Sequence, residues 1–201
     1  MKKRVILIGG APGAGKTTLG SALAVKLGVN SLTIDDLVTA SVAITTPETH
    51  QGLHVMRKTH HTDYYTNSSL EQLKADATLR HEATFPMVER LIRKYVKRDA
   101  GIVIDGWHIR PQWVAELALD SVVSCWLVVE PSVLEARERK QSAFFEGSAN
   151  PEKMFENFLG RSLWYNALIE EQASQLGMKI LRQTGNKSVY ELCEEVIDTL
   201  E

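Results

Sequence analysis

A glycine-rich loop near the N-terminus constrains the fold of this chain more than any other feature. Residues 4–8, mostly apolar, predict a buried strand, and the stretch "GGAPGAG" follows it directly. From Gly10 to Thr17 the spacing is G-x-x-x-x-G-K-[ST], placed after a strand and at the start of a helical pattern, as this motif requires. The sequence therefore predicts a loop that cradles phosphate groups.

The residue types in this loop suit a bound nucleoside triphosphate. Glycines let backbone N–H groups close around phosphate oxygens, and the helix N-terminus adds a favourable field. We expect Lys16 to reach the β- and γ-phosphates and the Thr17 hydroxyl to ligate Mg²⁺. The predicted nucleotide-binding residues of the loop are Gly10, Ala11, Pro12, Gly13, Ala14, Gly15, Lys16, Thr17 and Thr18.

Length and charge limit the classes of protein to which this chain can belong. With 201 residues, 44% of them apolar, it can bury a sizeable core, and we expect a single domain over 1–201. A formal net charge of −2 makes a nucleic-acid partner improbable. The apolar run after "MKKR" is too short for a signal peptide or a membrane span, and a disulfide between the two cysteines is not expected. These features predict a cytoplasmic protein without a membrane partner.

Strand and helix patterns alternate along the rest of the chain. A helical period begins at Ser69, and Pro86 should kink or divide that segment, whereas the pattern of residues 44–68 predicts a partly irregular insertion. The other predicted strands are 31–34, 101–106, 121–129 and 178–181, and the other predicted helices are 15–27, 132–142, about 151–176 and 188–200. This alternation predicts an α/β fold in three layers, with a mostly parallel five-stranded sheet covered on both faces.

The segment "TGNKSV" at 184–189 bears on the choice of nucleotide. It follows the last predicted strand, where a guanine-reading Asn-Lys-x-Asp would lie, but Val189 occupies the place of the required carboxylate. Because guanine would lose that partner, we expect ATP as the nucleotide and Asn186 on its adenine side.

Two neighbouring carboxylates follow the second predicted strand, which we expect to lie next to the first. A group that orients and deprotonates an acceptor hydroxyl would be placed there, across the cleft from the γ-phosphate. Asp35 comes first after the strand and is the preferred base, with Asp36 as the alternative. The other member of the pair would cap the following helix.

The stretch "IVIDGWHIRP" at 102–111 supplies a third group of candidates. Asp105 ends an apolar strand and is the expected ligand of Mg²⁺, directly or through water, although a turn-forming role is the alternative. Trp107, His108 and Arg110 follow it onto the loop above the sheet and are candidate substrate-binding residues. His108 could equally be a packed loop histidine, and Arg110 a solvated surface charge.

A basic segment after the fourth predicted strand is typical of a lid, which we place at about 137–161. Arg137, Arg139 and Arg161 could neutralise charge on the transferring phosphoryl group. The alternative is a solvated helix face. Of these, Arg137 and Arg139 are predicted to be catalytic and Arg161 to bind substrate.

The insertion at 44–68 is the predicted acceptor-binding region, with some of His60, His61, Tyr64 and Tyr65 as candidate contacts and His60 and Tyr64 preferred. A cleft that already holds a triphosphate would repel a second anion unless cations were concentrated there. Such cations are present in the insertion and beside Asp105: Arg57, Lys58, His60, His61, His108 and Arg110. We therefore expect a small acceptor that carries a carboxylate or phosphate, with a neutral nucleoside or sugar as the alternative.

The motifs "GGAPGAGKTT", "TIDDL" and "IDGWHIRP" together resemble those of small-molecule P-loop kinases, most closely the 2-phosphoglycerate kinase-like group. The stretches at 63–92 and 150–181 are also similar to bacterial members. This resemblance implies a nucleoside monophosphate kinase-like P-loop NTPase fold and ATP- and Mg²⁺-dependent phosphoryl transfer to a small molecule. Asp105 stands where many 2-phosphoglycerate kinases have Glu, so the resemblance does not name the substrate.

Two other functions remain open from the sequence. One is a regulatory or binding module that hydrolyses nucleotide slowly, which would need neither Asp35 nor a basic lid. The other is a kinase that acts on a nucleoside, a sugar or a polynucleotide end.

Overall fold

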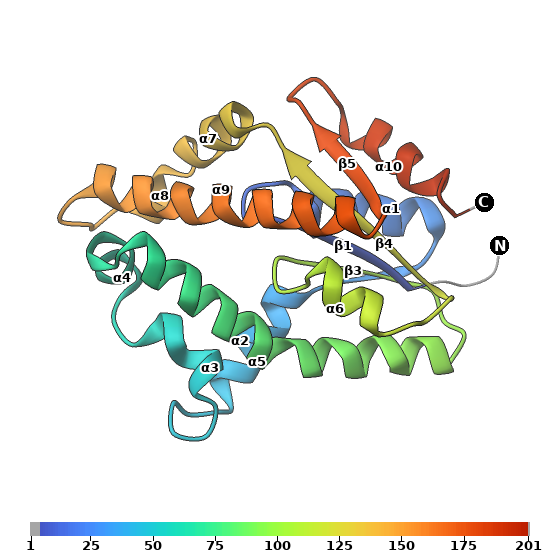
Figure 1. Ribbon diagram of the computed structural model, residues 1–201, viewed down its shortest axis with the longest axis horizontal. Coiled ribbons are helices and arrows are strands. Elements are labelled where there is room, and N and C mark those ends of the chain that lie inside the picture. The colour runs from blue at the N-terminus through green and yellow to red at the C-terminus, as the bar shows by residue number, and fades with distance from the viewer. Residues whose placement is uncertain (1–4, 201) are drawn as a thin grey trace.

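A five-stranded sheet, parallel throughout, forms the centre of the molecule (Figure 1). The computed structural model describes residues 5–200. Along the sheet the strands run in the order β2-β3-β1-β4-β5. Their bounds are β1 Val5–Gly10, β2 Asn30–Thr33, β3 Ile102–Gly106, β4 Val122–Val129 and β5 Lys179–Gln183. The predicted α/β architecture with a five-stranded parallel sheet is confirmed.

The position of β2 differs from the prediction, because β3 lies between β1 and β2. In the register, Ile8 of β1 lies beside Asp105, and Asp105 lies beside Thr33 of β2. Burial explains this order: β1 and β3 are buried along their whole length, whereas Asn30 and Ser31 of β2 are exposed. A strand with polar, exposed residues is suited to the sheet edge, and fully apolar strands to its middle.

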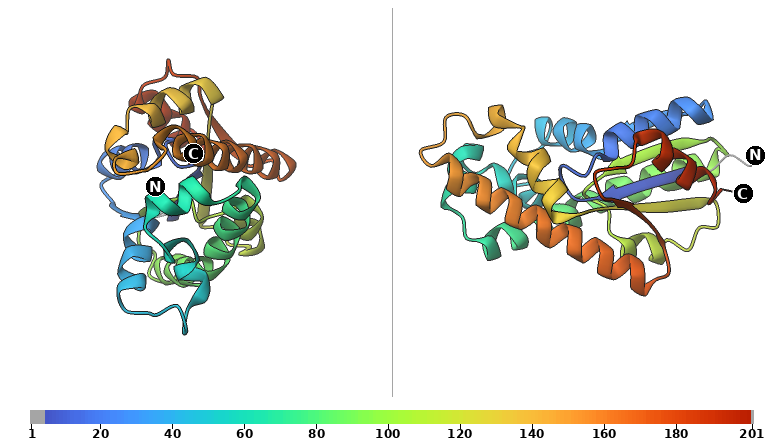
Figure 2. Two further views of the ribbon diagram at one scale, coloured as in Figure 1. Left: turned by 90° about the vertical axis from the view of Figure 1, so that its left-hand side faces the viewer. Right: turned by 90° about the horizontal axis from the view of Figure 1, so that it is seen from above.

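Helices cover both faces of the sheet. On one face lie α1 (Lys16–Leu27) and α10 (Val189–Ile197), and on the other lie α5 (Leu70–Lys97), α6 (Pro111–Glu116) and α9 (Pro151–Gln175) (Figure 2). The short helix α6 was not expected from the sequence. At one end of the sheet, α7 (Pro131–Arg139) and α8 (Ser142–Phe145) lead into α9.

The insertion is more regular than its sequence suggests. After α2 (Ile34–Ala43), it contains α3 (Gln51–His54), a 3₁₀ turn η1 (Val55–Arg57) and α4 (His61–Asn67). These short helices pack against α5 and α9. Tertiary packing of this kind stabilises helices that are too short to form alone.

Pro86 does not divide α5, which runs as one helix of 28 residues. Ser69 caps its start by accepting a hydrogen bond from the Gln72 backbone N–H. A proline removes one helical hydrogen bond, but Val88 and Ile92 beyond it are fully buried in the main core. That burial offsets the lost hydrogen bond.

Both cysteines, Cys125 and Cys193, are buried free thiols, so the expected absence of a disulfide agrees with their placement. Across residues 5–200, no helix combines the length and the apolar character needed to cross a bilayer.

Strands β1 and β4 approach each other closely at Gly9, which has no side chain. A Cβ added at Gly9 would overlap the ring of Trp126, which is fully buried. We therefore expect Gly9→Ala to lower the free energy of unfolding by about 1–3 kcal/mol, as overpacking does, measured by chemical denaturation. Gly160→Ala in α9 is the matched control, because its nearest neighbour is the flexible end of Leu70 at 3.3 Å. An equal loss of stability in both variants would contradict this account.

Candidate active site

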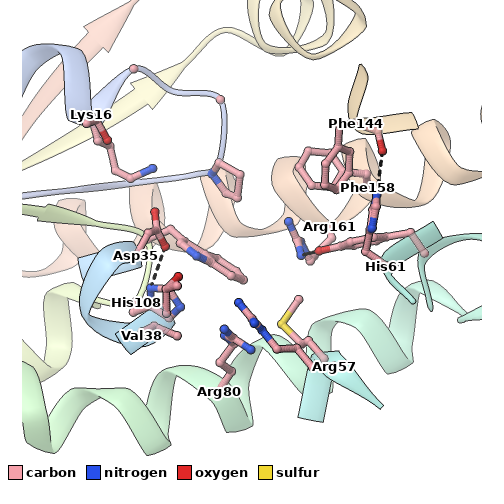
Figure 3. A pocket seen from close by; sticks show the side chains of 18 of the residues that line it. Lys16, Asp35, Val38, Arg57, His61, Arg80, His108, Phe144, Phe158 and Arg161 are labelled. Atoms are coloured by element: carbon pink, nitrogen blue, oxygen red, sulfur yellow. Dashed lines mark hydrogen bonds and ion pairs between the residues drawn. The ribbon is translucent and has the colours of Figure 1, made fainter. Parts of the chain in front are cut away.

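The candidate site is a cavity of about 740 Å³ that opens beside the glycine-rich loop. Its walls come from the loop, α2, the insertion, α5, the turn after β3, α8 and α9, so segments far apart in sequence meet there. Parallel strands place their carboxyl ends at one edge of a sheet, which is where open α/β sheets bind ligands. The charged side chains that line it include Lys16, Asp35, Arg57, Arg80 and Arg161 (Figure 3).

The glycine-rich loop has the backbone that a phosphate cradle needs. Gly13 and Gly15 have φ values of 74° and 97°, in the left-handed region that favours glycine. Lys16 begins α1 and is only 6% exposed, and its Nζ donates to the Ala11 carbonyl oxygen at 2.8 Å. Burial lowers the pKa of Lys16, and the nearby carboxylates oppose that shift. The ammonium thus lies at the mouth of the loop, within reach of an incoming phosphate.

Asp105 and two hydroxyl groups form an oxygen cluster at the ends of β2 and β3. The Thr17 and Thr33 hydroxyls donate to Asp105 Oδ1 at 2.8 and 3.3 Å. Asp105 is 2% exposed, and burial raises its pKa, although these hydrogen bonds and Lys16 act in the opposite direction. Carboxylate and hydroxyl oxygens are the donors that Mg²⁺ prefers. The chemistry of this donor set therefore fits the predicted metal.

Asp35 lies in the first turn of α2 and not at the end of a strand. The helix begins at Ile34 and Thr33 occupies its N-cap, so neither Asp35 nor Asp36 is the cap that the sequence suggested. Asp35 lines the cavity, and its Oδ1 lies 3.5 Å from His108 Nδ1. Asp36 is exposed and does not line the cavity.

The cavity walls raise the pKa of Asp35 by removing water from around its carboxylate, even though about half of the side chain is exposed. Lys16 and Arg80 partly offset this rise. His108 is 1% exposed, and burial holds its pKa well below the ordinary value, so its imidazole is neutral at pH 7. The sequence left open whether His108 is a packed histidine or a residue of the site. It is both, because it is buried and neutral and also lines the cavity beside Asp35.

The two neighbours of His108 that were expected to bind substrate lie in different places. Trp107 lines the cavity and is 9% exposed. Arg110 lies outside it, because its guanidinium donates to the Thr78 hydroxyl at 2.9 Å and stacks on Trp113 at 4.9 Å. Arg110 occupies the N-cap of α6, and Pro111 follows at a first-turn position that suits its fixed φ.

The insertion contributes three of its four candidate contacts to the cavity. His60 and His61 line the cavity, as does Tyr65. Tyr64 does not, because its hydroxyl donates to Asp76 of α5 at 3.0 Å within a buried cluster. Adjacent residues of a helix point about 100° apart, and the sequence did not show which of the two tyrosines faces the cavity.

Arg80 is the residue of the site that the sequence reasoning missed. It lies on the buried side of α5, is 7% exposed, and donates to the Leu53 carbonyl oxygen at 2.9 Å. Its position, three residues after the buried Ala77 and eight before Val88, is on the apolar stripe of the helix. A charged residue on the apolar stripe of a helix was the feature of the sequence that could have identified Arg80 as a site residue.

The arginines of the predicted lid point in three directions. Arg137 donates to the Ala14 carbonyl oxygen at 2.8 Å and so contacts the glycine-rich loop. Arg139 faces solvent, where it pairs with Glu135 and Glu152. Arg161 lies on α9, is 2% exposed, and lines the cavity.

A second cavity of about 350 Å³ adjoins the glycine-rich loop on its other side. The residues that line it include Thr18, Leu127, Arg137, Lys187 and Val189. This position beside the loop suits a nucleotide base. Asn186 is exposed and does not line this cavity, whereas its neighbour Lys187 does.

Glu138 is the most unusual charged group near the loop. It is 1% exposed, its Oε1 has no hydrogen-bond partner within residues 5–200, and it packs against Gly13. Burial raises its pKa above the ordinary value of 4.5, and Arg161 and Lys16 offset part of the rise.

Replacing Glu138 should reveal this burial as a pH-dependent change in stability. When a carboxyl group has a higher pKa in the folded protein than in the unfolded chain, the free energy of unfolding decreases as pH rises. The decrease takes place between the pKa of the unfolded chain and that of the folded protein. Glu138→Gln cannot titrate, so its melting temperature relative to that of the unmodified protein should increase as pH rises above the ordinary pKa of a glutamate, about 4.3. Glu135→Gln, on the same helix but half exposed, is the control. A difference independent of pH would contradict the assignment.

Solved structures of small-molecule kinases have the same fold. A shikimate kinase from Acinetobacter baumannii, solved in complex with shikimate, is 15% identical with a TM-score of 0.53, over 98% of this chain and 93% of that one. A shikimate kinase from Bacteroides thetaiotaomicron is 17% identical with a TM-score of 0.56, over 98% of each chain.

A sugar kinase from Janibacter sp. HTCC2649 is 16% identical with a TM-score of 0.58, over 98% of this chain and 94% of that one. No protein-family model matches this sequence, and no curated protein matches it. The chain is similar to these kinases along nearly its whole length, and it has the α/β P-loop NTPase fold.

Proposed function

We propose that this protein is an ATP-dependent kinase that transfers the γ-phosphoryl group to a hydroxyl of a small anionic molecule. One observation carries the proposal: a carboxylate, Asp35, lies in the same cavity as Lys16 and the glycine-rich loop. A protein that only bound or hydrolysed nucleotide would need no cavity that extends from the glycine-rich loop to Arg80 and Arg161, with a carboxylate in its wall. The shikimate kinases and the sugar kinase of the same fold act on small molecules, which supports this interpretation.

The loop and α1 would bind the triphosphate. Backbone N–H groups around Gly13 and Gly15 surround the phosphates, and Lys16 exchanges its contact with Ala11 for one with phosphate oxygens. Thr17 and Asp105 would hold Mg²⁺, which neutralises charge that develops on the phosphate oxygens. The adenine would occupy the smaller cavity beside Lys187.

Asp35 would act as the general base. Its carboxylate accepts the proton of the acceptor hydroxyl while that oxygen bonds to the γ-phosphorus and the bond from this phosphorus to the β–γ bridging oxygen breaks, leaving ADP. The raised pKa of Asp35 brings the base closer to neutral pH, where proton transfer is most effective. Arg137, which already contacts the loop, is the lid residue best placed to neutralise charge on the phosphoryl group.

Charge in the cavity supports an anionic acceptor. Of the cations predicted from the sequence, Arg57 lines it, Lys58 and Arg110 do not, and His108 lines it as a neutral group. His60 and His61 of the insertion line it as well. The two buried free thiols suit a reducing compartment such as the cytoplasm. The resemblance to 2-phosphoglycerate kinases offers one anionic acceptor to test.

Removal of the phosphate-facing groups should weaken nucleotide binding. Lys16→Ala removes the ammonium and Thr17→Ala removes a metal ligand, so we expect each to weaken Mg²⁺-ATP binding by at least about tenfold, or 1.4 kcal/mol, measured by isothermal titration calorimetry. Lys26→Ala, on the same helix but exposed and paired with Glu194, is the control. Unchanged binding in both loop variants would refute the nucleotide site.

Replacing the base should separate chemistry from binding. Asp35→Asn keeps the shape but cannot accept the proton, so transfer should fall by about 10²- to 10⁴-fold while Mg²⁺-ATP binding persists. ADP release is measured with a panel of hydroxy acids, phosphorylated acids, nucleosides and sugars. Asp36→Asn is the matched control, because Asp36 lies outside the cavity.

The pH profile gives a second readout for Asp35. Since only the ionised carboxylate is a base, turnover should fall as pH decreases through its raised pKa, at a higher pH than for an ordinary aspartate. Full turnover in Asp35→Asn, or loss in Asp36→Asn alone, would overturn the choice of base.

A further inference from the structure

Two buried arginines in the larger cavity have no carboxylate partner. Arg80 is 7% exposed and Arg161 is 2% exposed, and neither forms an ion pair within the described residues 5–200. Arg80 donates to the Leu53 carbonyl oxygen, and Arg161 donates to the Tyr65 hydroxyl while its Nε has no partner. Both side chains point into the cavity, as does the exposed Arg57 (Figure 3).

Burial of charge without a counter-ion is costly, so this arrangement is incomplete without an anion. Burial lowers the pKa of Arg80, the neighbouring positive charge of Arg57 lowers it further, and Asp35 acts in the opposite direction without forming an ion pair. Of the described residues that line the cavity, Asp35 is the only carboxylate, and it lies toward Lys16. The arginines therefore face an anionic group that a ligand must supply.

The wall beside these arginines is aromatic. Phe144 and Phe158 line the cavity on the side away from Lys16 (Figure 3), and Tyr65 lies beside them. The Arg161 guanidinium carbon is 5.0, 4.7 and 4.8 Å from the ring centroids of Tyr65, Trp107 and Phe158. A guanidinium held among rings keeps its charge available and offers a flat apolar surface next to it.

A compact, doubly charged acceptor would leave this wall uncovered. In 2-phosphoglycerate, a phosphate and a carboxylate sit on a three-carbon chain, so little carbon surface remains to contact the rings. The cavity, which includes the glycine-rich loop, also extends as far as this aromatic wall.

We propose that the acceptor is amphipathic, with a single anionic group bound by Arg57, Arg80 and Arg161, an apolar carbon body against Phe144 and Phe158, and its reacting hydroxyl at Asp35. This inference rests on the proposed kinase function and specifies its substrate class. A hydroxylated carboxylic acid with an apolar ring or branched chain has this chemistry. A phosphate monoester of an apolar alcohol has it as well, and the two are distinguished by the test.

Binding of small probes tests the two parts of the ligand separately. The probes are cyclohexanecarboxylate, acetate, cyclohexanecarboxamide, cyclohexyl phosphate and 2-phosphoglycerate, each titrated calorimetrically into the full chain. We expect cyclohexanecarboxylate or cyclohexyl phosphate to bind at least about tenfold more tightly than acetate and the amide, because ring and charge each contribute. The tighter of the two identifies the anionic group.

Variants assign each contribution to its residues. Arg80→Gln should remove the advantage of the acid over the amide, and Arg57→Gln should reduce it without disturbing a buried position. Phe144→Leu should reduce the advantage of the ring over acetate. Arg93→Gln, on an exposed side of α5 and paired with Glu89, is the matched control. Thermal unfolding of each variant identifies any that fail to fold.

The possible outcomes separate this inference from the kinase assignment. Equal binding of the amide would exclude an anion site, and equal or tighter binding of acetate or 2-phosphoglycerate would exclude the apolar contact. Each result overturns the inference, as does probe binding that ignores both arginine substitutions. If an acceptor from the activity panel is phosphorylated but does not compete with the probe, the inference fails and the kinase stands. If the probe binds as expected in a protein that does not bind Mg²⁺-ATP, the kinase assignment fails and the amphipathic ligand site stands.

Discussion

Pairing of β1 with β3 determines where the polar groups of the candidate site lie. Because these central strands are parallel and in register, Gly9 lies beside Gly106, and the loops after both strands emerge at the same edge. Thr17 at the start of α1 therefore meets Asp105 at the end of β3. β2 packs on the far side of β3 and brings Thr33 to the same carboxylate. The oxygen cluster thus follows directly from strand order.

Burial of opposite charges dominates the energetics of this edge. Burial lowers the pKa of Lys16 and raises those of Asp35 and Asp105. Lys16 opposes the shift of each carboxylate and both carboxylates oppose that of Lys16, whereas Asp35 raises the pKa of Asp105 further. Such an arrangement is costly for folding and useful for catalysis, because fixed charges in a site with little water act strongly on reacting groups.

Local signals in the sequence were sufficient for the fold and for the phosphate-binding half of the site. The motif from Gly10 to Thr17, taken with the strand before it and the helix after it, indicated one arrangement, and apolar runs marked the strands. Strand order was not in the local pattern, so β2 was placed beside β1. The acceptor half was harder to predict because it depends on which face of a short helix turns inward. Thus Tyr65 and Arg80 line the cavity, and Tyr64 and Arg110 do not.

The two halves of the cavity differ in how their charge is compensated. At the glycine-rich loop, Lys16 has carboxylates nearby, and the loop can exchange those contacts for a ligand's phosphates. At the other end, Arg80 and Arg161 contact carbonyl, hydroxyl and aromatic groups, and the charges of Asp35 and Glu138 act on them without forming an ion pair. Ligand binding at that end would supply the missing charge instead of replacing an existing partner. An anionic acceptor should therefore gain more binding free energy from these buried arginines than it would from two solvent-exposed arginines. The cost of removing water from the buried guanidinium groups has already been met in folding.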